Sequence, residues 1–143
     1  MDFTLTEDQE TIGKVARQLF EHRATPEHLA ELEGGDVRHD AGLWRELATA
    51  DLLGISLPED VGGSGRGFVE LALLLTEVGW SVAPVPAYAT LLLGADTIAR
   101  YGDDAQRKMV AGLHLVIHEV GPGERLDGLL RARDGIAQAV GVE

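Results

Sequence analysis

The spacing of apolar residues constrains the fold most strongly, because they recur every three or four positions through most of the chain. This period places apolar side chains along one face of a helix. Between about Thr6 and His22 that face is formed by Ile12, Val15, Ala16, Leu19 and Phe20. Thr6 and Gln9 stand at the spacing of a capping box, which predicts where this first helix begins.

Five further helices are expected before residue 114, starting near residues 25, 40, 67, 86 and 103. At the second of the six, Thr25 is a favourable N-cap and Pro26 suits the first helical position. Residues 54–58 are expected to be extended, since the residue before a proline avoids the helical region. The glycines among residues 62–67 predict a tight loop. The prediction is an all-α fold, a bundle-like domain of six helices.

The last part of the chain has a different pattern. Leu115, Val116 and Ile117 favour a short strand or extended segment, and the glycines and proline of residues 121–123 would end it. The apolar residues from Leu126 onward then predict an amphipathic helix. We therefore expect a helical domain over residues 1–113 and a divergent tail over residues 114–143.

Composition and charge argue against several classes of protein. The chain has no cysteine, which excludes disulfides and thiolate zinc sites. Its net charge is −12 and no segment concentrates Lys and Arg, so nucleic-acid binding is not expected. No apolar run is long enough to span a membrane, and the start of the chain lacks a signal-peptide pattern. A cytoplasmic location is the expectation.

Few residues offer the chemistry of a catalytic or metal site. His114 and His118 are four residues apart, but the β-branched residues between them favour a strand over a metal-binding helix. Glu59 and Asp60 precede a glycine turn, where solvated acids are common. Glu70 and Glu77 would mark the solvent-facing edge of the fourth helix. These patterns predict no catalytic residues, no cofactor-binding residues and no metal ligands.

The glycine-rich loop of residues 62–67 could suggest a phosphate-binding loop. It lacks the Lys and Ser/Thr of a P-loop, and it does not have the glycine spacing of the dinucleotide fingerprint. The pattern favours a structural turn that packs beside the fourth helix.

Four segments, in matching order and spacing across about 113 residues, resemble the acyl-CoA dehydrogenase family. They are residues 1–9, residues 43–48 with 52–55, residues 57–65 and residues 101–108. The most specific is L-P-E-D-V-G-G-S-G at residues 57–65, close to the family's L-P-E-E-Y-G-G-S-G. Asp51 and Ala111 replace the family's frequent Gly and Pro, and the resemblance ends after Leu113.

The resemblance implies the N-terminal domain of a flavoprotein that oxidises the α,β-bond of acyl-CoA thioesters, with FAD as the hydride acceptor. By position, Ala89, Leu93 and Thr97 on the fifth helix would contact the acyl group, and the small Ala89 would leave space for a bulky or long one. No β-domain and no C-terminal helical domain can be aligned after Leu113. The chain alone is therefore expected to be inactive and not to bind FAD.

Three other interpretations stay open at this stage. The chain could be a non-enzymatic helical module that binds a separately encoded flavoprotein chain, or a second copy of itself, through an exposed apolar face. It could be a small acyl-binding carrier that uses the pocket near Ala89 and Leu93. It could also be a truncated product whose tail arose from a frameshift.

Overall fold

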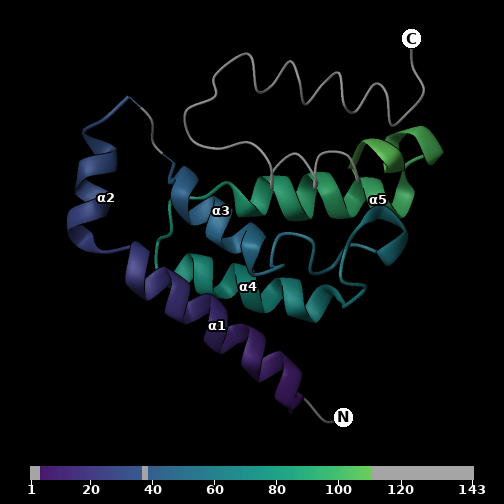
Figure 1. Ribbon diagram of the computed structural model, residues 1–143, viewed down its shortest axis with the longest axis horizontal. Helices are drawn as coiled ribbons and strands as arrows, with labels where there is room; N and C mark the ends of the chain where they lie inside the picture. Colours follow the sequence, from purple (N-terminus) through teal and green to yellow (C-terminus); the bar gives the residue numbers. More distant parts are fainter. Residues whose placement is uncertain (1–3, 37–38, 111–143) are drawn as a thin grey trace.

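The computed structural model describes residues 4–36 and 39–110, and in these residues the chain forms helices and no strand (Figure 1). Residues 104–110 are also helical. The named elements are α1 (Glu7–Arg23), α2 (Pro26–Glu33), α3 (Ala41–Thr49), the 3-10 helix η1 (Glu59–Val61), α4 (Phe68–Trp80), the π-helix η2 (Tyr88–Asp96) and α5 (Thr97–Tyr101). The all-α prediction is confirmed.

The core lies where α1, α3 and α4 meet. Helix α1 packs beside α4 and also contacts α3, and Figure 1 shows α3 between α4 and the η2–α5 helix. The largest fully buried side chains come from these three helices: Phe20, Leu43, Leu47, Leu71 and Leu74. Each contributes roughly 1.5–3 kcal/mol by leaving water, so this seam is the main source of stability.

The predicted helix starts agree with the structure. The Thr6 hydroxyl accepts a hydrogen bond from the Gln9 amide at 3.3 Å, and the Gln9 side chain accepts one from the Thr6 amide at 3.0 Å. This is the predicted capping box of α1. Thr25 caps α2 through the His28 amide, and Pro26 is the first residue of that helix.

The extended structure predicted for residues 54–58 is wrong, because residues 53–56 form turns. The Leu57 amide donates to the Gly54 carbonyl at 3.1 Å. A strand would point alternate side chains in opposite directions. Turns instead allow several nearby apolar side chains to face the interior, and these are the buried Leu52, Leu53, Ile55 and Leu57.

The fifth helix also differs from the prediction of one continuous α-helix near residues 86–101. It is a π-helix over η2 and becomes α-helical only at α5. The Thr97 hydroxyl donates at 3.1 Å to the carbonyl of Leu92, five residues earlier. Apolar spacing can indicate a helix, but it does not show whether the backbone amides follow the α-helical or the π-helical hydrogen-bond pattern. Long π-helical stretches are rare, and π-bulges are frequent at functional sites.

The proposed tail and its boundary lie outside the residues that the structure describes. This covers the expected strand at 115–117, the amphipathic helix from Leu126 and the His114–His118 pair. Among the described helices, none has the length and apolar character needed to cross a membrane.

Candidate functional site

The three residues predicted to contact an acyl group lie together on an exposed part of the fifth helix. Ala89 and Leu93 belong to η2, Thr97 begins α5, and all three are exposed. Successive members are four residues apart, which places them near one helical face. Tyr88 is 59% exposed and Leu93 57% exposed, so this face offers apolar surface to solvent. We call Tyr88, Ala89, Leu93 and Thr97 the η2 face.

The other side of the same helix is buried. Ala87, Leu91 and Ala99 pack into the interior. Thr97 uses its hydroxyl hydrogen on the Leu92 carbonyl. That donor is therefore not available to a ligand, which leaves the η2 face with mainly apolar groups. A surface of this kind can exclude water from an apolar ligand.

Asp96 anchors the junction between η2 and α5. Its side chain is buried, and its Oδ2 atom accepts a hydrogen bond from Arg100 Nε at 2.7 Å. This hydrogen bond, together with the aspartate charge, raises the pKa of Arg100. The other oxygen, Oδ1, is buried without a hydrogen-bond partner among the described residues. A buried carboxylate is strongly destabilising without a charged partner. Arg100 is therefore needed to stabilise the Asp96 carboxylate at the end of the π-helix.

The glycine-rich loop is a structural turn, as predicted. The amides of residues 63–65 donate to the carbonyls of Pro58, Gly54 and Leu57, at distances of 3.0, 3.0 and 2.9 Å. A side chain at Gly63 would overlap the backbone of Leu57. These three amides therefore bind carbonyls of the same chain.

Asp60, beside Glu59, is engaged in an ion pair. Asp60 is bound by the guanidinium of Arg107, whose other terminal nitrogen donates to the Ala99 carbonyl at 2.5 Å. Arg107 thus ties the 104–110 helix to η1 and α5. Within residues 4–36 and 39–110 there is no group of three or more side chains that could hold a metal ion.

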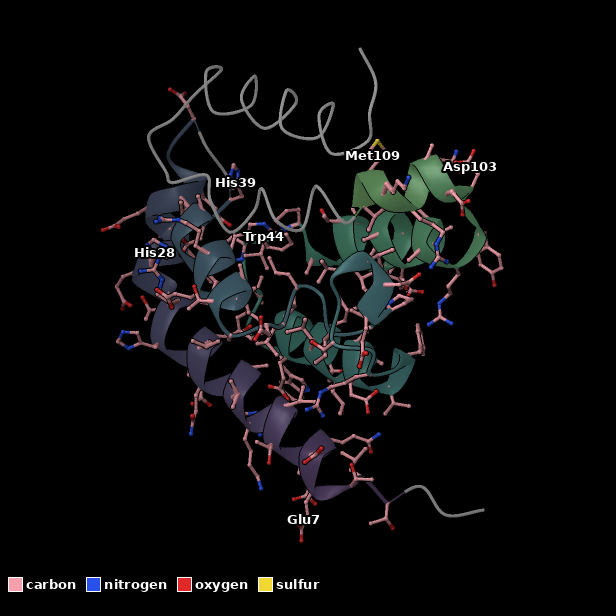
Figure 2. The ribbon with its side chains drawn as sticks, turned by 45° about the vertical axis from the view of Figure 1, so that its right-hand side comes forward. Glu7, His28, His39, Trp44, Asp103 and Met109 are labelled. Atoms are coloured by element: carbon pink, nitrogen blue, oxygen red, sulfur yellow. The ribbon has the colours of Figure 1, made fainter. Side chains whose placement is uncertain are left out.

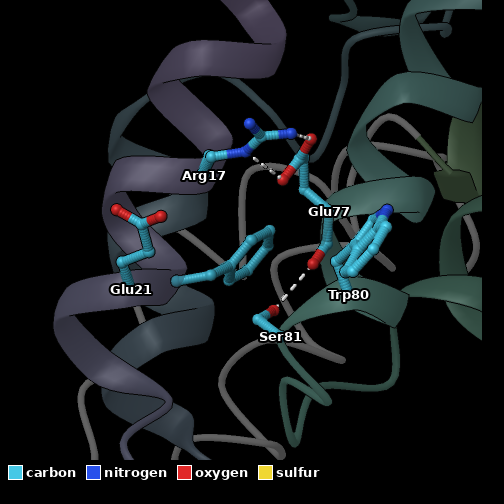
Figure 3. Close-up of a pocket in the computed structure, with 6 residues that line it drawn as sticks. Arg17, Glu21, Glu77, Trp80 and Ser81 are labelled. Carbon is cyan, nitrogen blue, oxygen red and sulfur yellow. Dashed lines mark hydrogen bonds and ion pairs between the residues drawn. The ribbon is translucent and has the colours of Figure 1, made fainter.

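The prediction that Glu77 faces solvent is wrong. Its carboxylate is only 10% exposed and binds Arg17 through two hydrogen bonds, from Nε at 2.9 Å and from Nη2 at 2.7 Å (Figure 3). The hydrogen bond to Glu77, with its negative charge, raises the pKa of Arg17. No local sequence pattern indicates this pair, because its partners lie 60 positions apart on α1 and α4.

Glu70 was also expected at the solvent edge, but it has a defined structural role. It accepts hydrogen bonds from Gln9 Nε2 at 3.0 Å and from the Gly67 amide at 2.9 Å. The Gln9 bond is the largest of the influences that lower the pKa of Glu70. Glu70 therefore caps α4 and joins it to α1.

A cavity of about 320 Å³ opens between the C-terminal ends of α1 and α4 (Figure 3). Sequence patterns did not predict it. We call it the α1–α4 cavity, and it is lined by Arg17, Phe20, Glu21, Glu77, Trp80 and Ser81. It shares no residue with the η2 face.

These observations define a helical domain with an exposed apolar face on its fifth helix. The sequence pattern of the acyl-CoA dehydrogenase N-terminal domain matches residues 6–112. The chain therefore belongs to the acyl-CoA dehydrogenase family, as the four sequence segments indicated. This family is generally FAD-dependent.

Individual relatives agree with this assignment. The chain is 37% identical over 102 residues to acyl-CoA dehydrogenase FadE27 of Mycobacterium tuberculosis, covering 71% of this chain and 27% of that protein. A solved Tcur3481-Tcur3483 steroid ACAD variant is 44% identical with a TM-score of 0.72, over 78% of this chain and 30% of that one.

A second solved structure, the ChsE4-ChsE5 complex of M. tuberculosis, is 33% identical with a TM-score of 0.72. It covers 82% of this chain and 32% of that chain. That structure is a complex of two proteins, ChsE4 and ChsE5. The chain spans about 27–32% of the length of these three relatives.

Proposed function

We propose that this chain forms one wall of the acyl pocket in a flavin-dependent acyl-CoA dehydrogenase. The whole protein would oxidise the α,β-bond of an acyl-CoA thioester. The observation that carries the proposal is the η2 face, an exposed and mainly apolar surface on a helix whose other side is buried. Exposed apolar surface of this kind marks a binding site. The acyl-facing domain would extend over residues 1–113, with residues 114–143 as a separate tail.

The role of the η2 face would be to position the acyl group and exclude water. Leu93 supplies apolar contact, and Thr97 can offer its methyl group because its hydroxyl hydrogen is already used. Ala89 is small, so the wall is recessed there and leaves room for a bulky acyl group. The similarity to a steroid ACAD supports a bulky, polycyclic acyl group as the substrate class.

FAD and the catalytic base would be supplied by other parts of the assembly. The glycine-rich loop has the amides of residues 63–65 engaged, and of the acids on α4, Glu70 caps the helix and Glu77 binds Arg17. The chain alone would therefore show no dehydrogenase activity. We also propose that the protein is cytoplasmic, as expected from the sequence.

Photolabelling tests the acyl contact directly. The full chain is irradiated with an acyl-CoA that carries a diazirine on its acyl group, and labelled peptides are located by mass spectrometry. We expect labels within residues 88–97. Leu93→Glu should lower the labelling roughly fivefold or more, because a charge on the apolar face costs at least about 1 kcal/mol.

Val15→Glu is the matched control, since Val15 is also an exposed apolar residue, 38% exposed, on the distant helix α1. It should leave labelling at residues 88–97 unchanged. Labels spread evenly over the chain, or concentrated at the α1–α4 cavity, would contradict the proposed acyl contact.

A second candidate is a partner subunit of a separately encoded flavoprotein chain. The exposed large apolar residues on the fifth helix and beyond favour it, namely Tyr88, Leu93, Tyr101 and Met109. A relative solved as a two-protein complex supports the same interpretation. Co-purification of a flavin-carrying chain with this chain would favour this candidate.

A further inference from the structure

We propose that the α1–α4 cavity binds an arginine side chain presented by a partner polypeptide. The cavity is about 320 Å³, near the lower end of the roughly 300–1,000 Å³ typical of ligand pockets. It is built by elements other than the η2 face. The inference therefore does not depend on the proposed acyl-binding function.

The charges around the cavity favour a cation. Its lining has one positive residue, Arg17, and two negative residues, Glu21 and Glu77, which leaves a net charge of −1. Arg17 and Glu77 neutralise each other through two hydrogen bonds. Within residues 4–36 and 39–110, the Glu21 carboxylate has no salt bridge or hydrogen bond and only a longer-range electrostatic effect on Arg17. Glu21 is thus the lining carboxylate that can form an ion pair with a positively charged ligand.

Two acceptors of the cavity have capacity left, the Glu21 carboxylate and the Ser81 hydroxyl oxygen. The Ser81 hydroxyl donates to the Glu77 carbonyl at 2.7 Å, so its oxygen lone pairs remain to accept a hydrogen bond. The donors Arg17 Nε and Nη2 are already engaged by Glu77. A guest with several N–H donors can pair with both acceptors at once, and the guanidinium of arginine has this property.

Trp80 provides an aromatic surface for the same guest. Trp80 is 80% exposed and lines the cavity (Figure 3). Phe20, which is 1% exposed, also belongs to the lining and is apolar. A guanidinium over an indole face gains roughly 0.5–2 kcal/mol from the cation–π interaction. The apolar stem of an arginine side chain can pack on the same aromatic groups.

The turn that follows Trp80 supports an interaction role. Val82 has a φ angle of +50° and is 72% exposed. A β-branched residue rarely adopts this left-handed conformation. Backbone strain that is retained in a fold often marks a functional surface. Two large apolar side chains, Trp80 and Val82, are thus exposed to solvent at the end of α4, and Trp80 also lines the cavity with Glu21.

The charge of the whole chain determines which kind of partner fits. At a net charge of −12, the chain attracts positively charged segments and repels acidic ones. We therefore assign the cavity to an arginine within a basic segment of a partner polypeptide, with Trp80 and Val82 forming the apolar edge of the contact.

The test is an NMR titration of the full chain with N-acetyl-arginine N-methylamide, compared with the neutral citrulline analogue. Trp44 and Trp80 are the two tryptophans, so the Trp44 indole signal is an internal reference. We expect a saturable shift of the Trp80 indole N–H signal with the arginine probe and none with citrulline. Glu21→Gln should weaken the affinity roughly two- to fivefold, as loss of one exposed ion pair predicts.

Glu10→Gln is the matched control, because it removes the same charge from the same helix at an exposed position. It should not change the affinity. The proposal is overturned if Trp80 does not respond, if citrulline binds equally well, or if Glu21→Gln has no effect. A Trp80 shift on raising the protein concentration alone would assign the cavity to a second copy of the chain and would also overturn the proposal.

Discussion

Asp40 is the residue on which the junction of α1, α2 and α3 depends. It caps α3, and its carboxylate accepts hydrogen bonds from the amides of Gly42 and Leu43 at 2.8 and 2.9 Å. It also binds Arg23 at 3.0 Å and lies 2.9 Å from His28 Nε2. His28 belongs to α2 and is labelled in Figure 2. One buried carboxylate thus holds three helices together.

These contacts predict how stability depends on pH. Burial alone would raise the pKa of Asp40, but hydrogen bonds from Leu43, His28 and Gly42 and the charge of Arg23 outweigh it and lower the pKa. The unfolded reference value is 3.8. The stabilisation is therefore complete above that pH and is lost as the pH falls through the lower, folded pKa.

Asp40→Asn should reduce this loss of stability below about pH 4, measured as the free energy of unfolding in urea at several pH values. At neutral pH the variant should itself be less stable by roughly 1–2 kcal/mol, because the charged hydrogen bonds of Asp40, including that from Arg23, become neutral ones. Asp36→Asn, at an exposed position, is the control and should keep the wild-type pH profile. An unchanged profile in Asp40→Asn would contradict the assigned role.

Single residues could be predicted from the sequence where their partners are local. The capping pair of Thr6 and Gln9 spans three positions, and its pattern was sufficient to predict the hydrogen bonds. Glu77 could not be assigned in this way, because Arg17 comes from another helix. On sequence alone, an acid on an apolar helix is expected at the solvent edge. Only the packing of α1 against α4 shows that this acid is buried and paired.

At the scale of elements, α3 and α4 end with the same hydrogen-bond pattern. After α3, the Leu52 amide donates to the Leu47 carbonyl at 3.0 Å and the Asp51 amide to Ala48 at 2.9 Å. After α4, Ala83 donates to Val78 at 3.0 Å and Val82 to Gly79 at 3.3 Å. These are Schellman motifs, which favour glycine at the left-handed position. Here Asp51 and Val82 occupy it, with φ angles of +56° and +50°.

Val82→Gly should therefore stabilise the fold by about 0.5–1 kcal/mol, measured by thermal or urea unfolding. The left-handed conformation costs a side chain roughly 1–2 kcal/mol, and the greater freedom of glycine in the unfolded chain offsets part of the gain. Val15→Gly is the control, since it lies within α1 and should destabilise. A destabilised Val82→Gly variant would show that the Val82 side chain contributes more than its exposure suggests.

Some secondary-structure elements could be predicted from the sequence and others could not. Caps and apolar spacing indicated the starts of α1 and α2 and the existence of all the main helices. They could not predict the π-helical register of η2, because apolar spacing does not report which carbonyl each amide contacts. They also misassigned residues 54–58, where burial of neighbouring apolar side chains favours turns over an extended segment.

At the scale of the whole molecule, two surfaces have different characters. The η2 face is mainly apolar and uncharged, which suits an acyl group. The α1–α4 cavity combines an exposed indole with an unpaired carboxylate, which suits a cation. The family resemblance pointed to the first surface by position but gave no indication of the second. Distant pairing within the fold created the second, so no local motif could have shown it.

The central claim is that this chain supplies the acyl-facing helical domain while FAD is held elsewhere in the assembly. The most direct measurement is the visible absorbance of the purified chain after incubation with FAD and removal of free ligand. We predict no flavin band, because the amides of the glycine-rich loop are occupied by carbonyls of the same chain. A flavin band at a near-stoichiometric amount would contradict the claim and would place a cofactor site within these 143 residues.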